Sequence, residues 1–376
     1  MRGHVARRGK TWSYVIDVAP DPATGRRRQR SKGGFPTKGA AEDAMREAIA
    51  KGSSSGKGSQ RLGDYLAEWI VTVRPRLRET TFNGYQMAVD RVTAGLGAVR
   101  MDDLTPLAIE RFYAELLKTG GRREQGLSAK SVRNTHVALR KALADAERLE
   151  LIDRNPAARA RPPRGERVEI VTWTSAQVAQ FLRGAADDPL FALWVLLATT
   201  GLRRGEALGL RWKDVDLERA TLSVSQTITA VQHGVIVSPP KSDRSRRRLG
   251  LDPDTIRVLT DHQQAQQRDR DLLGLGPAPL VFCTPEGEPL HPDAVTRRFK
   301  TLVRWSGLPM LRGPHDLRHT WASLALAAGV HPKVVSDRLG HSTIAITIDT
   351  YSHAIPSLDA DAAAIVASKL FGDSDG

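Results

Sequence analysis

Apolar side chains recur every three to four positions through a long central part of the chain. Leu62, Leu66 and Trp69 follow this spacing, and similar runs come after them. Such a period places the apolar residues on one side of an α-helix. Ser128 stands directly before one of the later runs, where a hydroxyl side chain commonly begins a helix. The pattern predicts a four-helix domain over residues 61–158.

At the N-terminal end the pattern changes to alternation. Residues 11–18 alternate and are rich in β-branched and aromatic side chains, which is typical of a strand. A turn at 21–25 leads into a second, strongly basic strand over 26–32, and a helix is expected over 38–50. We therefore expect a small three-stranded sheet with one helix within residues 1–55.

The C-terminal part, residues 170–376, mixes helices with short strands. Helices are expected from Ser175, over 189–198 and over three short segments near the C-terminus, at 315–329, 332–339 and 343–350. Strands are expected at 235–237 and 247–251. This order predicts an α+β domain. The whole chain is thus expected to be multidomain and mainly α with small β-sheets, with linkers at 51–59 and 155–165.

Charge changes this picture, because it is large and uneven. The 376 residues carry 56 Lys and Arg against 42 Asp and Glu, a net charge of +14. Residues 1–60 alone hold 13 basic and five acidic side chains, a net charge of +8. Such a concentration favours a polyanion-binding module. An anionic membrane is the alternative partner, but no amphipathic basic helix accompanies the charge.

Two groups of basic residues are candidate DNA contacts. A basic antiparallel sheet can lie in a DNA groove, although a charged edge strand also protects a sheet from aggregation. Loops and helix ends of the helical domain commonly supply phosphate contacts. The candidates in the sheet are Arg26, Arg27, Arg28, Arg30 and Lys32, and those in the helical domain are Arg74, Arg76, Arg78, Lys130 and Arg133.

Other classes of protein are disfavoured. The single cysteine, Cys283, excludes intramolecular disulfides and thiolate zinc sites and fits a reducing cytoplasm. The N-terminus lacks the apolar core of a signal peptide. The longest apolar run, 189–198, is too short to span a bilayer. We therefore expect a cytoplasmic protein without a membrane partner.

The candidate chemistry is concentrated between His315 and His353. His315 and Arg318 are three residues apart on one expected helix, so both can face one target. His341 follows the end of the second helix, and Tyr351 lies at the end of the third. Arginine suits phosphate oxygens, imidazole suits proton transfer, and tyrosine can act as a covalent nucleophile.

Each of these residues also has an alternative interpretation. A tyrosine near a helix end most often packs in a core, and a His-x-x-Arg pair usually lies on a solvated face. His315 and His319 also imitate the His-Glu-x-x-His zinc motif, with Asp316 in place of the glutamate. This zinc alternative is disfavoured, because Asp is shorter, no third ligand follows, and Arg318 would stand beside the metal.

Further motifs upstream match one family. Thr200-Gly201-Leu202-Arg203-x-x-Glu206 precedes Arg211-Trp212-x-Asp214, and the chain ends with His315-x-Leu317-Arg318-His319, Leu339-Gly340-His341 and Tyr351. In this order and at this spacing the motifs resemble the tyrosine recombinases, and in detail the integrases of phages and integrative elements. The resemblance extends over essentially the whole chain. It implies an arm-site-binding domain, a SAM-like core-binding domain and a catalytic domain.

The resemblance also implies a role for each site residue. Arg203 and Arg318 would clamp the scissile phosphate, which requires no metal. Lys241, in a basic turn, would protonate the leaving 5′ oxygen. His315 would transfer a proton and His341 would donate a hydrogen bond to the phosphate. Two further roles are implied: Glu206 would orient side chains, and Tyr351 would attack to give an O-(3′-phospho-DNA)-tyrosine intermediate.

The implied function is site-specific integration of a phage or mobile element through a Holliday junction. Four protomers would act on core and arm attachment sites in double-stranded DNA, with an excisionase or other directionality factor as a possible partner. The covalent bond conserves the phosphodiester energy, so neither ATP nor a metal is expected as a cofactor. A tail at 357–371 would dock on a neighbouring subunit or pack in cis. The alternatives are a type IB topoisomerase and a DNA-binding regulator without catalysis.

Overall fold

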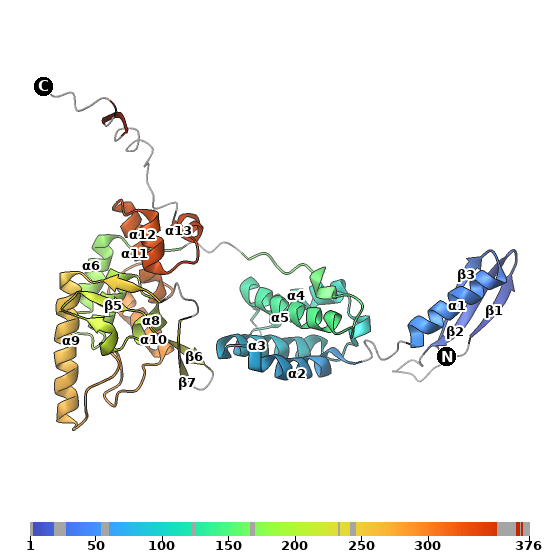
Figure 1. The fold of residues 1–376 in the computed structure, drawn as a ribbon, viewed down its shortest axis with the longest axis horizontal. Helices are drawn as coiled ribbons and strands as arrows, with labels where there is room; N and C mark the ends of the chain where they lie inside the picture. Colours follow the sequence, from blue (N-terminus) through green and yellow to red (C-terminus); the bar gives the residue numbers. More distant parts are fainter. Residues whose placement is uncertain are drawn as a thin grey trace. The chain divides into compact units, whose positions relative to one another are not determined.

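The computed structural model describes residues 3–18, 28–53, 60–121, 125–165, 170–231, 234–240, 246–351, 366–368 and 370. The chain divides into two compact units, Met1–Arg167 and Val168–Gly376. The first contains a small sheet with a helix and a bundle of helices, and the second contains the motifs of the candidate site (Figure 1). In the part of the chain that the structure describes, no helix is long and apolar enough to cross a membrane.

The N-terminal sheet has the three strands that the sequence predicts. β1 (Gly3–Arg8), β2 (Thr11–Val18) and β3 (Arg28–Phe35) are antiparallel, and α1 (Lys38–Ser53) follows them. Alternation in β2 buries Tyr14 and Ile16. Helix α1 packs against this strand (Figure 1).

The third strand is longer than expected. The prediction ended it at residue 32, before two glycines, but β3 continues to Phe35. The continuation has a physical reason, since the Phe35 ring stacks on Tyr14 of β2 with ring centroids 5.9 Å apart. Of the predicted DNA contacts, Lys32 is exposed on β3 and Arg28 and Arg30 belong to the same strand. Arg26 and Arg27 lie outside the described residues.

The central region forms the four helices that the periodicity predicts. They are α2 (Leu62–Val73), α3 (Glu79–Leu96), α4 (Pro106–Thr119) and α5 (Ala129–Arg148). Their apolar stripes meet in one core, and Ser128 caps α5 by accepting a hydrogen bond from the backbone of Ser131.

The predicted DNA-contact residues of this bundle are exposed. Arg74 and Arg76 form the short 3-10 helix η1 (Arg74–Arg76) between α2 and α3, and Arg78 directly precedes α3. Lys130 and Arg133 are exposed in the first turns of α5. Their contact with DNA stays a prediction.

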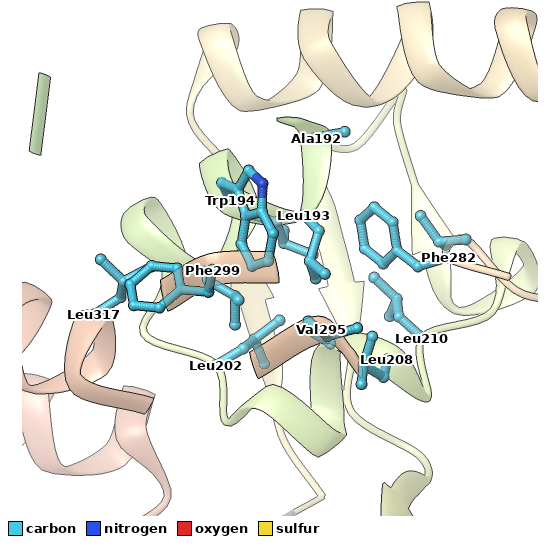
Figure 2. Packing of buried hydrophobic residues seen from close by; sticks show 14 of the residues in the cluster. Ala192, Leu193, Trp194, Leu202, Leu208, Leu210, Phe282, Val295, Phe299 and Leu317 are labelled. Carbon is cyan, nitrogen blue, oxygen red and sulfur yellow. The ribbon is translucent and has the colours of Figure 1, made fainter. Parts of the chain in front are cut away.

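The C-terminal unit is built around an apolar helix. The elements before the candidate site are α6 (Ser175–Gly184), α7 (Phe191–Thr200), α8 (Arg204–Leu208), β4 (Val215–Asp216), β5 (Thr221–Ser223), β6 (Thr227–Val231), β7 (Gly234–Ser238), β8 (Arg248–Gly250), α9 (Pro253–Leu272) and α10 (Pro292–Trp305). Helix α7 is apolar on all sides and is therefore buried. Figure 2 shows Trp194 of α7 beside Phe299 of α10, with ring centroids 5.6 Å apart.

The strands of this unit pair differently from the sequence prediction. The two strands predicted around Lys241 were expected to flank one turn. Instead β7 pairs with β6 in a two-stranded hairpin, and β8 pairs with β5 in a three-stranded sheet of order β4-β5-β8. Strand β6, which is close to β7 in the sequence, pairs with the backbone hydrogen-bonding groups of β7. Residues 239–247 therefore connect two separate sheets. Lys241 itself lies outside the described residues.

Three short helices end the described fold, as predicted. They are α11 (His315–Ala327), α12 (Pro332–Leu339) and α13 (Ile344–Tyr351). Gly329, the glycine predicted to end α11, directly follows its C-cap and has a φ of 80°. Gly340 ends α12 in the left-handed conformation with φ of 66°, which glycine adopts without steric cost. Most of the predicted tail at 357–371 lies outside the described residues, and Val366 and Leu370 within it are exposed.

Candidate active site

The first candidate residue, Arg203, follows a sharp helix ending. Gly201 caps α7 in the left-handed conformation with φ of 68°, and this redirects the chain so that α8 begins at Arg204. Arg203 lies at the N-cap of α8. Its backbone N–H and its Nη1 donate to the two carboxylate oxygens of Glu206, at 2.9 and 2.8 Å. The side chain of Arg203 is thus oriented by a residue one turn further along α8.

Arg318 lies on α11 and is nearly completely buried, with 2% of its surface exposed. Its Nη1 donates to the carbonyl oxygen of Gly201 at 2.9 Å, and its Nη2 donates to that of Leu339 at 2.6 Å. A buried cation needs such partners, because desolvation of an unpaired charge is costly. Loss of solvation, and then the positive charge of Arg203, lower the pKa of Arg318.

The C-terminus of α12 holds both arginines. The last carbonyls of a helix lack partners within the helix and carry the negative end of its dipole. The carbonyl of Leu339 accepts from Arg318, and the next carbonyl, that of Gly340, accepts from Nη2 of Arg203 at 3.3 Å. Two guanidiniums from α11 and from the start of α8 are therefore brought together at one helix end.

Glu206 is a buried carboxylate between two cations. Besides Arg203 it accepts hydrogen bonds from Nη1 and Nη2 of Arg247 at 3.1 and 2.9 Å. Burial by itself would raise the pKa of Glu206, but the hydrogen bonds and charge of Arg247, followed by the charge of Arg203, lower it to about 2. Arg247 also donates to the carbonyl of Arg338 in α12 at 2.6 Å. Glu206 and Arg247 therefore join α8 to α12.

His341 directly follows the α12 cap. Its Nδ1 lies 2.8 Å from the hydroxyl oxygen of Thr347 on α13, which fixes the orientation of the ring. Burial, and then the positive charges of Arg318 and Arg203, lower the pKa of His341 to about 4. The imidazole is therefore neutral at neutral pH and stands close to both arginines.

Tyr351 ends α13 and is buried, with 1% of its surface exposed. Its hydroxyl lies 2.7 Å from Nδ1 of His319 on α11. Burial raises the pKa of Tyr351 to about 12, although the charges of Arg318 and Arg203 oppose this rise. The phenol thus carries its proton at neutral pH while it lies within the field of both guanidiniums.

A groove opens beside these residues. Its volume is about 620 Å³, and it lies over the starts of α8 and α11 and beside β6. The side chains of His315 and His319 reach it, and their rings meet edge to face with centroids 5.2 Å apart. Loss of solvation and the neighbouring positive charges lower the pKa of His315. The basic side chains lining the groove are Arg203, Arg204 and Arg312.

The structure brings most of the predicted site residues together. Hydrogen bonds or electrostatic interactions connect Arg203, Glu206, His315, Arg318, His341 and Tyr351. Lys241 lies outside the described residues, so its role stays a prediction.

Sequence reasoning missed two contacts of this site. Arg247 belongs to a run of arginines, and the sequence did not show which of them would contact the site. The available signal is the position of Arg247 directly before β8. His319 was considered only as a zinc ligand. Among the described residues no group of three His, Cys, Asp or Glu side chains could hold a metal ion, so His315 and His319 lack a third ligand there.

The arginines, histidines and tyrosine of this cluster form the candidate active site. Comparison with known proteins places the chain in a family of DNA recombinases. The profile of the phage integrase family matches residues 174–357. An arm DNA-binding domain matches residues 5–52, and the N-terminal SAM-like domain of phage integrases matches residues 61–117. The chain belongs to the phage integrase family.

Individual relatives agree with this membership. The integrase of Mycobacterium phage D29 is 30% identical over 284 residues, covering 74% of this chain and 71% of that protein. A tyrosine recombinase XerC-like protein of Caldanaerobacter subterraneus is 28% identical over 320 residues, covering 78% of this chain and 80% of that protein.

Solved structures share the fold. The Tn1549 transposon integrase in complex with transposon right end DNA has a TM-score of 0.68 at 22% identity, covering 82% of this chain and all of that one. A lambda integrase tetramer bound to a Holliday junction has a TM-score of 0.59 at 19% identity, covering 93% of this chain and 94% of that one. Both confirm the predicted fold class.

Proposed function

We propose that this chain is a site-specific integrase in which Tyr351 cleaves DNA and forms a 3′-phosphotyrosine bond. The observation that carries the proposal is the meeting of Arg203 and Arg318 at the end of α12, with the Tyr351 hydroxyl in their electrostatic field. Phosphoryl transfer builds negative charge on the non-bridging oxygens. Two fixed guanidiniums stabilise that charge more in the transition state than in the ground state.

The remaining residues of the cluster support the two arginines. His341 is neutral and oriented by Thr347, so it can donate a hydrogen bond to a phosphate oxygen. Glu206 and Arg247 hold Arg203 and α12 in place. Lys241 is proposed as the acid that protonates the leaving 5′ oxygen, on the resemblance alone. Because charge stabilisation is supplied by arginines, we propose that cleavage requires neither metal nor ATP.

The partner is double-stranded DNA with core and arm attachment sites. The net charge of +14 and the family match to an arm DNA-binding domain support this assignment. Two duplexes have four strands to exchange and each protomer supplies one Tyr351, so four protomers are expected to act together. A separate directionality factor would choose between integration and excision.

Covalent trapping tests the proposal. A pool of nicked duplexes with randomised sequence is incubated with the full chain, and protein-linked DNA is recovered under denaturing conditions and sequenced. The enriched sequence then serves as a suicide substrate in single-turnover reactions. The wild type should form an adduct that protease treatment reduces to a 3′-linked peptide containing Tyr351.

The matched control is Tyr351→Phe, which removes only the nucleophilic oxygen. It should bind the selected duplex as tightly as the wild type and form no adduct. An adduct in this variant would reject Tyr351 as the nucleophile. Cleavage that stops with chelator and returns with zinc would instead support the His315–His319 zinc alternative. Relaxation of supercoiled DNA without joining of two sites would favour the topoisomerase alternative, and binding without any adduct would favour a regulator.

A further inference from the structure

The Tyr351 hydroxyl has a specific partner that the resemblance did not supply. Nδ1 of His319 lies 2.7 Å from the phenol oxygen, which is a normal length for such a hydrogen bond. The two rings are inclined at 50° with centroids 5.7 Å apart. Within the described residues, this is the hydrogen bond that the Tyr351 hydroxyl makes. His319 also reaches the groove that His315 lines.

The electrostatic surroundings make this pair an acid and a base. Burial raises the pKa of Tyr351 to about 12, so the phenol needs help to ionise near neutral pH. Burial, followed by the opposing charge of Asp316 and the positive charges of Arg312 and Arg318, leaves the pKa of His319 below its usual value. A neutral imidazole can accept a proton through Nδ1. The titratable and charged groups around His319 are Asp316, His315, Arg318, Arg312, Tyr351, His341, Arg203 and Arg204.

We propose that His319 is the catalytic base that takes the proton from Tyr351 when the tyrosine attacks the scissile phosphate. This inference rests on the proposed function. In the cleavage step the O–H bond of Tyr351 breaks, the proton moves to Nδ1 of His319, and the phenol oxygen forms a bond to phosphorus. The bond from phosphorus to the 5′ oxygen breaks, and that oxygen takes a proton from a separate acid. In ligation His319 returns its proton to the departing phenolate.

Two other roles for the pair predict different behaviour. His315 was assigned the proton transfer by resemblance, yet it is His319 that contacts the phenol oxygen, while His315 meets His319 edge to face. A second possibility is that His319 only holds Tyr351 in its buried position. Loss of the bond would then release the nucleophile and speed cleavage, whereas loss of a base would slow it.

The test is the single-turnover cleavage rate of the full chain on the suicide duplex from pH 6 to 9. His319→Asn keeps a polar side chain that cannot act as a base. Its rate at pH 7 should fall by roughly 10²–10⁴, the usual contribution of general base catalysis. The wild-type rate should be nearly constant above pH 7, because His319 is already neutral. The variant rate should rise about tenfold per pH unit, because the phenol must then ionise to solvent.

A second substitution gives an independent readout. Incorporating a fluorinated tyrosine at position 351 lowers the pKa of the phenol, and a more acidic nucleophile depends less on a base. It should restore much of the rate of His319→Asn. It should restore little in Arg318→Ala, where the missing group stabilises phosphate charge.

Matched controls separate the outcomes. His331→Asn makes the same change at an exposed histidine of the same unit and should leave rate and pH profile unchanged. An unchanged or faster rate in His319→Asn overturns the proposal, as does the tenfold slope appearing in His315→Asn instead. If His319→Asn fails to bind the duplex, the profile of His319→Gln decides in the same way. Absence of an adduct in the wild type would reject the proposed function itself.

Discussion

Replacing Glu206 with glutamine should destabilise the C-terminal unit markedly. Glu206 is 5% exposed and accepts four hydrogen bonds, two from Arg203 and two from Arg247. The glutamine amide would turn an NH₂ group toward one of these donors and remove the negative charge between them. The side chain of Arg247, 8% exposed, would lose its ion-pair partner.

The expected magnitude follows from the pKa of the carboxyl group. A fall from 4.5 to about 2 corresponds to about 3 kcal/mol of folding free energy at 1.36 kcal/mol per unit. Breaking a buried ion pair by removing one partner costs about 3–5 kcal/mol, which agrees. Because the pKa is lowered in the folded state, the contribution is present above pH 4.5 and is lost as the pH falls toward 2.

The stability is measured by urea unfolding of the full chain. Hydrogen exchange in peptides from α7 monitors the C-terminal unit, because α7 lies in its core. Glu206→Gln should be about 3 kcal/mol less stable than the wild type from pH 8 to about 5, and the difference should narrow at lower pH. The control Glu218→Gln alters an exposed glutamate and should change nothing. A deficit below about 1 kcal/mol, the usual value of a surface pair, or one independent of pH, would refute the reasoning.

Three further outcomes are expected. Deleting residues 1–55 should spare cleavage at the core site and weaken recombination of complete attachment sites, because the arm domain raises the local concentration of a second site. Footprinting should show lost protection away from the core site, and an equal loss of core cleavage would contradict the prediction. Lys241→Ala should regain cleavage when sulfur replaces the bridging 5′ oxygen, because a leaving thiol with a pKa of about 8.5 needs no acid to protonate it. If single-turnover rates show no rescue, another residue must protonate the leaving oxygen. Gly201→Ala should lower the free energy of unfolding by about 1–2 kcal/mol or more, because φ of residue 201 is 68° and the added Cβ would lie 2.9 Å from Leu339 and 3.0 Å from Trp321. An unchanged midpoint of urea unfolding would contradict this prediction.

Local signals in the sequence predicted the elements well. Ser128 caps its helix in the structure as expected, because a capping hydrogen bond joins residues three positions apart. Strand pairing was harder to predict. The partner of β8 is β5, more than twenty residues earlier, and no local signal distinguishes it from the nearer β7.

The candidate site divides in a similar way. The motif positions came from a resemblance, and the structure brings Arg203 and Arg318 to the same helix end. The contact of Arg247 with Glu206 could not be predicted, because the sequence does not show which arginine of a charged run faces inward. Arg248, the next residue, donates instead to Thr221 on the sheet and remains exposed. Alternation along a strand is visible in a sequence, but its direction is set by the rest of the fold.

The end of α12 connects the two arginines to the helix that carries Tyr351. The carbonyls of Leu339 and Gly340 anchor both guanidiniums, and α13, which carries Tyr351, begins only four residues later. A displacement of this helix end would loosen the proposed phosphate clamp and shift the proposed nucleophile in the same movement. A substitution that moves this helix end is therefore expected to disturb both arginines and Tyr351 together, so that no single part of the site is displaced alone.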